Sequence, residues 1–201
     1  MRRSRRRSIR FGRIDIREVD EATLILNLYI TQGLILAAAV ALILLGGIGW
    51  REMFVPLPGA GVTVVTYGIL FAALVLCLEG LISWILPEEF ADVGGVNEKL
   101  FRNRSLPHIA VICLVVATCE ELLFRGAVQH FIGAYWTSVL FAAIHVRYLR
   151  SGLMTLAVFA ISYGLGWIYD RTGTLLTPII AHFTVDFALG YIIARREKFD
   201  G

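Results

Sequence analysis

Apolar segments long enough to cross a lipid bilayer fill most of this chain, and they limit its fold more than any other feature. The sequence is 57% hydrophobic over 201 residues, and its mean hydropathy of +0.71 is far above that of a soluble domain. A transmembrane helix needs ~20 apolar residues, and the chain lacks the alternating pattern of an outer-membrane barrel. We therefore predict an all-α, polytopic transmembrane helical bundle of about six spans. The predicted spans are residues 24–50, 62–86, 108–131, 134–149, 152–169 and 174–194.

Lysine and arginine are distributed unequally between the predicted loops. The loops on one side contain only Arg51 and Arg171. The other side holds eight arginines before the first span and most of the remaining cations. Because basic loops stay in the cytoplasm, we predict that both termini are cytoplasmic. The cations on that side are Arg2, Arg3, Arg5, Arg6, Arg7, Arg10, Arg13, Arg17, Lys99, Arg102, Arg104, Arg147, Arg150, Arg195, Arg196 and Lys198.

The predicted topology divides the chain into three parts. Residues 1–23 form a basic cytoplasmic segment, residues 24–106 contain the first two transmembrane helices and a cytoplasmic loop, and residues 107–201 form a four-helix core with a basic tail. An arginine-rich segment can bind nucleic acid or anionic lipid. Because this one directly precedes a membrane span, we expect it to bind anionic lipid and no nucleic acid. The features favour an integral protein of a prokaryotic plasma membrane.

Two adjacent glutamates and an arginine interrupt the third predicted span. Glu120 and Glu121 follow a run of apolar residues, and Arg125 lies one helical turn beyond them. A charged side chain at the bilayer centre costs about 2.5–3.5 kcal/mol on insertion scales, so this cluster indicates a functional site. Residues four apart share a helix face, so Glu121 can pair with Arg125. Glu120 lies about 100° around the helix from Glu121 and need not share that partner.

Histidines and an aspartate recur at the same spacing in later spans. His145 lies four residues after Phe141 in the fourth span, which is short and comparatively polar. Asp186 lies four residues after His182 in the sixth span, so that each pair shares a helix face. Counted from the nearest loops, these groups lie between the midplane and the cytoplasmic side. We expect them to meet Glu120 at a site that is open to the cytoplasm.

Two kinds of chemistry suit a carboxylate and two histidines that converge from three helices. A buried carboxylate beside a cation can be poised as a general base. Glu120 and His145 can then hold a water molecule for amide hydrolysis, while His182 and Asp186 stabilise the developing oxyanion. Alternatively, Glu120, His145 and His182 can bind a divalent metal such as zinc. The first mechanism requires no cofactor, and the second requires a metal ion. The sequence is compatible with both mechanisms.

The charged residues also form three motifs that resemble those of a known family. The family is CPBP, the CAAX-protease and bacteriocin-processing intramembrane proteases, which includes the type II CAAX prenyl endopeptidases. The segment 164–173 is similar to the family's lead-in to its third motif, and the resemblance covers about 107–194. The three motifs are Glu-Glu-x-x-x-Arg at Glu120, Glu121 and Arg125, Phe-x-x-x-His at Phe141 and His145, and His-x-x-x-Asn at His182, with Asp186 in place of the asparagine.

The resemblance implies a role for each matched residue. Glu120 and His145 would activate water, and His182 with the residue at position 186 would bind the oxyanion. Glu121 and Arg125 would support the site, as would Phe141. Asp186 departs from the family pattern, because an ionised aspartate cannot donate a hydrogen bond as an asparagine does. Either Asp186 is protonated, or it orients His182 and stabilises its imidazolium, and we favour the second interpretation.

These observations predict an intramembrane endopeptidase that acts on a membrane-anchored peptide or protein. Two other functions use the same features. A non-catalytic scaffold or bacteriocin-immunity protein can keep the fold without turnover, and a proton-coupled carrier can use intramembrane glutamate and histidine as a relay. The sequence does not identify the substrate or the oligomeric state.

Overall fold

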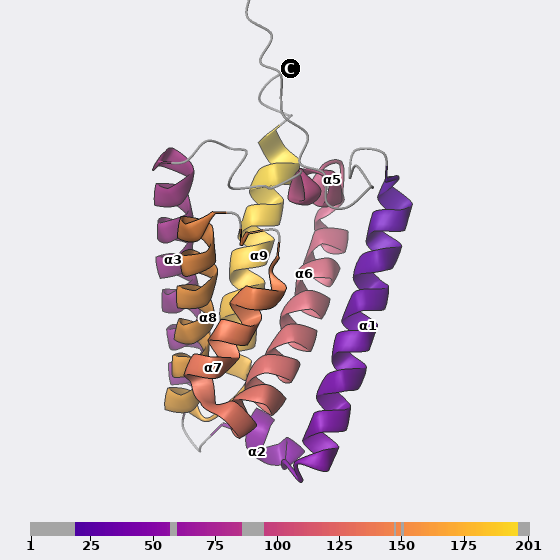
Figure 1. Ribbon diagram of the computed structural model, residues 1–201. Helices are drawn as coiled ribbons and strands as arrows, with labels where there is room; N and C mark the ends of the chain where they lie inside the picture. Colours follow the sequence, from indigo (N-terminus) through magenta and orange to yellow (C-terminus); the bar gives the residue numbers. More distant parts are fainter. Residues whose placement is uncertain (1–18, 57–59, 86–94, 147, 150, 197–201) are drawn as a thin grey trace, which may run out of the picture.

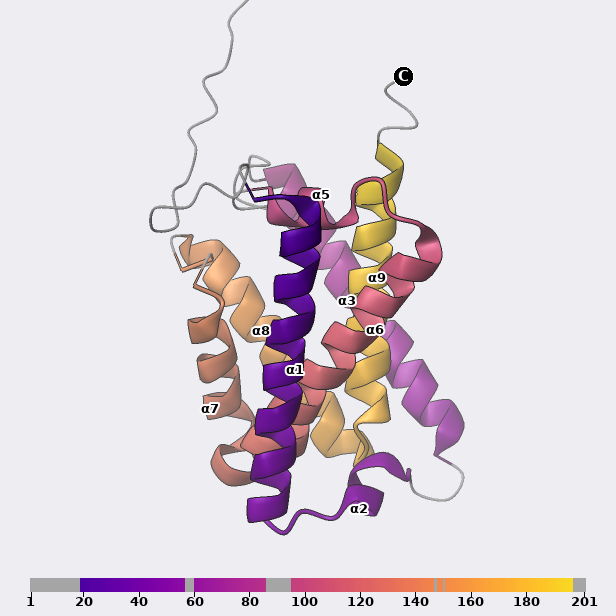
Figure 2. The same ribbon diagram turned by 90° about the vertical axis from the view of Figure 1, so that its right-hand side faces the viewer.

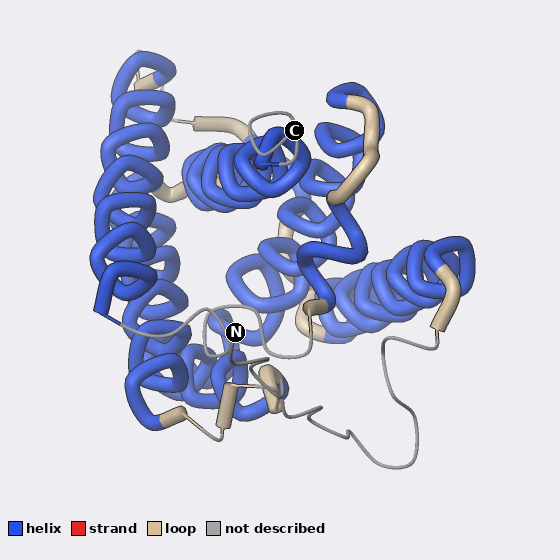
Figure 3. The backbone as a smooth tube through the Cα atoms, turned by 90° about the horizontal axis from the view of Figure 1, so that it is seen from above, coloured by secondary structure: helices blue, strands red, loops and turns tan. Residues whose placement is uncertain are grey.

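The computed structural model describes residues 19–56, 60–85, 95–146, 148–149 and 151–196, all of whose regular elements are helices (Figures 1 and 3). The all-α, polytopic membrane bundle predicted from the sequence is confirmed. The N-terminal arginines lie outside the described residues. The elements are α1 (Glu21–Leu45), α2 (Trp50–Phe54), α3 (Gly61–Ile85), α5 (Val96–Phe101), α6 (Leu106–Glu121), the π-helix η1 (Leu122–Val128), α7 (Gln129–Ile144), α8 (Gly152–Thr172) and α9 (Leu176–Arg196).

The bundle has two distinct ends, named here after the short helices that lie there (Figure 1). α1 begins and α9 finishes at the α5 end, whereas the opposite α2 end holds the link between α1 and α3. Arg104 forms an ion pair with Glu21 at 3.1 Å and so fixes the start of α1 to the α5–α6 link. At the α2 end, Leu175 N–H donates to the Met53 carbonyl at 2.7 Å, which fixes α2 to the start of α9.

Five helices in the described part of the chain are long and apolar enough to cross a membrane. The third of them, Leu106–Ile144, joins the predicted third and fourth spans. Gly133 breaks it, with φ 72° and ψ 167°, a conformation that is essentially restricted to glycine. Beyond Gly133 the chain reverses, so that α6 and α7 run in opposite directions (Figure 1). The predicted fourth span is thus an arm of about 11 residues, roughly 16 Å long, which is half a bilayer core.

The prediction that the first span extends to residue 50 is wrong at its C-terminal end. α1 finishes at Leu45, and Gly47 turns the chain with φ 63° before α2 begins at Trp50. Glycine adopts a positive φ without steric cost, so the two consecutive glycines, Gly46 and Gly47, end the helix although the run remains apolar.

α9 lies inside the bundle and contacts α3, α5, α6 and α8. Its approach to α3 depends on a small residue, because a Cβ atom at Gly68 would lie 2.9 Å from Ile180 Cγ2. α8 is similarly close to α3, since a side chain at Gly164 would overlap the Phe71 ring. α9 also packs directly against α6. α9 carries His182 and Asp186, and α6 carries both glutamates.

Candidate active site

The hairpin at Gly133 aligns the first two motifs. Gly133 lies eight residues after Arg125 and eight before Phe141, so both side chains lie two helical turns from the reversal. The Arg125 guanidinium lies 5.3 Å from the centre of the Phe141 ring. Phe124 meets the same ring edge to face, with 4.8 Å between ring centres. Phe141 therefore joins the two arms, and its predicted supporting position is consistent with these contacts.

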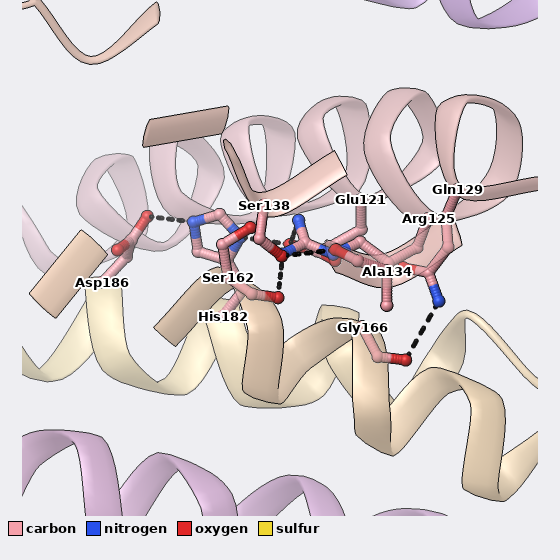
Figure 4. Close-up of polar contacts among 9 residues, drawn as sticks. All are labelled: Glu121, Arg125, Gln129, Ala134, Ser138, Ser162, Gly166, His182 and Asp186. Atoms are coloured by element: carbon pink, nitrogen blue, oxygen red, sulfur yellow. Dashed lines mark hydrogen bonds and ion pairs between the residues drawn. The ribbon is translucent and has the colours of Figure 1, made fainter. Parts of the chain in front are cut away.

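Glu121 and Arg125 form the buried centre of the site. Their side chains are 0% exposed, and Arg125 Nη1 donates to Glu121 Oε1 at 3.1 Å. Arg125 Nη2 donates to both the carbonyl and the hydroxyl of Ser162 on α8, each at 2.9 Å (Figure 4). A buried charge is tolerated when it is paired and hydrogen-bonded. The pair predicted from the four-residue spacing therefore exists, and it also links α6 with α8 through η1.

The segment after Glu121 departs from α-helical geometry. Residues Leu122–Val128 form a π-helix, which is rare and frequently lies at functional sites. The segment carries Arg125 and Gly126, both buried. A side chain on Gly126 would meet Leu175 Cδ1 at 3.2 Å and Met53 Sδ at 3.3 Å, so the wide turn fits tightly against the α2 end. The apolar periodicity of the sequence does not reveal this change of helix type.

His182 lies between two carboxylates. Its Nδ1 is 2.8 Å from Glu121 Oε1, and its Nε2 is 3.4 Å from Asp186 Oδ2 (Figure 4). The four-residue pair of His182 and Asp186 is thus present, but the shorter and stronger contact is the one with Glu121. Glu121 therefore orients the ring. Sequence periodicity could not predict this contact, because it joins two different helices.

The two contacts of His182 also specify where protons lie. A neutral imidazole has a single N–H, which Nδ1 donates to Glu121. The 3.4 Å contact between Nε2 and Asp186 is favourable when one further proton is held by Nε2 or by the Asp186 carboxyl group, because two unprotonated acceptors repel each other. In both cases one proton lies between these two residues.

Glu120 lies on the same turn but in a different environment. Its side chain is only partly buried, unlike the fully buried Glu121. The Glu120 carboxylate interacts electrostatically with the side chain of Gln32 on α1 and with His182, Asp186 and Glu121. The structure thus brings four of the predicted residues into one cluster from α6 and α9, with Glu120 at its accessible side.

His145 caps the end of α7. Its Nδ1 lies 2.7 Å from the Phe141 carbonyl oxygen, and its ring stacks near those of Phe141 and Tyr148. A carbonyl oxygen accepts, so Nδ1 carries a hydrogen. α6 and α7 diverge from the hairpin toward the α5 end (Figure 2), and the placement of His145 beside Glu120 stays a prediction.

The described residues do not bring together a set of metal ligands. Within the described residues, no three side chains of His, Cys, Asp or Glu are grouped so that they could hold a metal ion. Glu120, His145 and His182 accordingly do not fit a three-ligand site in this arrangement.

Two polar residues of the site were not predicted from the sequence. Ser162 accepts a hydrogen bond from Arg125. Gln32 contacts Glu120 from a span outside the motifs. A buried amide within an otherwise apolar span was the signal for Gln32. Ser162 carried no such signal, because serine is common at contacts between membrane helices.

Comparisons with known proteins agree with the motifs. The family model described as type II CAAX prenyl endopeptidase Rce1-like matches residues 102–188. The chain is 40% identical to the protein named "Uncharacterized protein YpbD" of Bacillus subtilis (strain 168) over 141 residues, which are 68% of this chain and 75% of that protein. No solved structure matches the chain. The matched region holds every residue of the three motifs, and the chain belongs to the CPBP family of membrane proteins, with a core like that of the type II CAAX prenyl endopeptidases.

Proposed function

We propose that the protein is an intramembrane endopeptidase in which Glu120 activates the water that hydrolyses a peptide bond. One observation carries the proposal, namely the different environments of the two glutamates. Glu121 is fully buried and accepts from Arg125 and His182. Protonation of Glu121 would remove the negative charge that pairs with the buried Arg125 guanidinium, so Glu121 is held as the counter-ion of Arg125. Glu120 is partly exposed on the same turn, so it is the carboxylate that water can reach.

The reaction steps follow from these positions. Glu120 accepts a proton from water while the water oxygen attacks the carbonyl carbon of the peptide bond. The carbonyl oxygen becomes an oxyanion, to which the proton held between His182 and Asp186 is donated as a hydrogen bond. The carbon–nitrogen bond then breaks as Glu120 returns its proton to the leaving nitrogen. The products are a carboxylate and an amine.

His145 contributes the second activating group in this proposal. In the neutral ring, the hydrogen bond from Nδ1 to the Phe141 carbonyl leaves the lone pair on Nε2. An Nε2 acceptor can orient the attacking water, as the family resemblance implies. No step requires a metal ion.

The substrate class follows from the location of the cluster within membrane helices. We infer a membrane-anchored peptide or protein, cleaved at a site open to the cytoplasm. The distribution of described cations supports this orientation. Lys99, Arg102 and Arg104 lie at the α5 end, while Arg51 and Arg171 lie at the α2 end. The α5 end would then be cytoplasmic, together with both termini.

The decisive experiment is cleavage of membrane-embedded peptides, prenylated and unprenylated, by the purified protein and its Glu120→Gln variant. Loss of the base should reduce turnover by about 10²–10⁴-fold while the protein remains folded. Glu79→Gln is the matched control, since Glu79 is a partly buried glutamate on α3 outside the cluster, and it should retain full turnover. Parallel assays with a chelator measure any dependence on metal.

Two results would contradict the proposal. Equal cleavage by the wild type and Glu120→Gln would exclude Glu120 as the base. Absence of cleavage, together with solute flux in proteoliposomes that follows a proton gradient, would identify a carrier instead.

A further inference from the structure

One face of α1 is directed into the bundle, and it includes an amide. The buried residues of α1 are Gln32, Ala39 and Ile43, which share this face. The large residues Leu26 and Leu34 face outward and are 58% and 67% exposed. In a membrane, a glutamine on the lipid-facing side would be costly. An inward-facing glutamine therefore indicates a polar partner within the protein.

Packing on both sides of Gln32 fixes its level along α6. Toward the start of α1, Leu24 and Leu28 pack against the cluster that contains Ile109 and Cys113. Further along α1, Ala39 and Ile43 belong to the cluster that contains Leu122. Gln32 lies between these contacts, so it faces α6 between residues 113 and 122. The two helices run in the same direction there (Figure 2).

The amide of Gln32 lies against the Glu120 carboxylate at this level and interacts with it electrostatically. An ionised carboxylate only accepts, so the amide must present its N–H₂ group to Glu120. Gln32 is 6% exposed. Its Oε1 is buried and has no hydrogen-bond partner in the described part of the chain. The contact with Glu120 therefore accounts for the burial of the amide.

We propose that Gln32 is a positioning residue that holds the Glu120 carboxylate in the orientation needed to accept a proton from water. This inference rests on the proposed function of Glu120. It assigns a part of the site to α1, which lies outside the region 102–188 matched by the family model. The first helix is then a component of the site in addition to a membrane span.

The kinetic test uses Gln32→Met, which keeps an unbranched side chain of similar length and removes both polar groups. We expect kcat to fall roughly 10- to 100-fold, the loss of one polar contact with a charged group, with KM and the thermal midpoint unchanged. Asn27→Leu is the matched control, because Asn27 is an exposed amide on the same helix, and it should leave kcat unchanged. An unchanged kcat in Gln32→Met would overturn the positioning role.

A second measurement does not depend on turnover. The infrared difference spectrum between the wild type and Glu120→Gln isolates the carboxyl band of Glu120. Gln32→Met should shift this band and Asn27→Leu should not; an unshifted band would overturn the contact itself. If no peptide is cleaved by the wild type but the band shifts, the proposed function fails and the contact stands. If Glu120→Gln is inactive while Gln32→Met matches the wild type, only the present inference fails.

Discussion

Glu121 and His182 are joined by a 2.8 Å hydrogen bond between Oε1 and Nδ1, which connects α6 with α9 at the centre of the bundle. The same oxygen accepts from Arg125, whose other nitrogen binds Ser162 on α8. One carboxylate oxygen therefore connects three helices. Glu121 also fixes the ring of His182, the residue proposed to bind the oxyanion.

Glu121→Gln should destabilise the protein strongly. The substitution keeps the shape of the side chain but leaves the buried Arg125 charge without its counter-ion. Breaking a buried pair by removing one partner costs about 3–5 kcal/mol, and the thermal midpoint in detergent should fall accordingly. Removing Arg125 as well, in Glu121→Gln with Arg125→Met, should recover part of the loss because no unpaired charge then remains.

The control for this variant is a surface ion pair with the same separation of 3.1 Å between nitrogen and oxygen. Glu21→Gln breaks the 3.1 Å contact with Arg104, in which the glutamate side chain is 50% exposed. Solvent screens such pairs, and the cost should stay below about 1 kcal/mol. A thermal midpoint in Glu121→Gln no lower than that of Glu21→Gln would show that the buried pair does not hold the bundle together.

Asp186→Asn should retain cleavage activity within about threefold. The Glu121 contact already orients His182, so Asp186 is not needed for that purpose. An asparagine amide donates a hydrogen bond without depending on a shared proton. The measurement is kcat/KM on the peptide cleaved by the wild type. A collapse of kcat/KM in this variant would instead mean that the carboxylate charge of Asp186 is required.

Gly133→Ala should reduce both stability and activity. An alanine at φ 72° and ψ 167° is strained by about 1–3 kcal/mol, and relief of that strain would turn α7 away from Arg125. Gly152→Ala is the control, since a Cβ atom there meets nothing within 4 Å and the backbone is helical. Thermal unfolding and peptide cleavage should separate the two variants. Equal behaviour would show that the chain can reverse at residue 133 without glycine.

The start of α1 should become less protected from hydrogen exchange in acid. Asp20 caps the helix, and the hydroxyl and N–H of Thr23 donate to its carboxylate, so the pKa of Asp20 lies below its usual range. Its stabilising effect is present above the unfolded value of ~3.9 and is lost as the pH falls through the lower folded value. The measurement is the hydrogen-exchange protection of the Thr23 amide as a function of pH, corrected for the intrinsic exchange rate. Asp20→Asn keeps the cap and should show no such pH dependence; identical profiles would contradict the role of Asp20.

Contacts within one helix were predictable from the sequence, and contacts between helices largely were not. The pairs Glu121–Arg125 and His182–Asp186 follow from a four-residue spacing that puts two side chains on one face. The Glu121–His182 bond depends on how α6 and α9 pack, which periodicity does not encode. The family resemblance identified both residues but gave Glu121 only a supporting role.

The ends of the helices were likewise predictable where they depend on local sequence, and not where they depend on contacts between helices. The predicted spans 108–131 and 134–149 leave a break at the position of Gly133, and glycine after an apolar run indicates such a break. The short length of the second arm and the π-helix were not predicted. Both depend on tertiary contacts, such as those of Gly126 with Leu175 and Met53, that override local preference.

Arg125 and Phe141 lie at equal distances along the chain from Gly133. Their contact therefore depends on the number of residues between the first two motifs as well as on the motif residues themselves. Inserting or deleting one residue within either arm would turn everything beyond it by about 100° and move it by ~1.5 Å. The Phe141 ring would then lose its contact with the Arg125 guanidinium, although every residue of the motifs was unchanged. A relative that keeps all three motifs but differs in length between positions 125 and 141 should therefore be regarded as a protein with a different site.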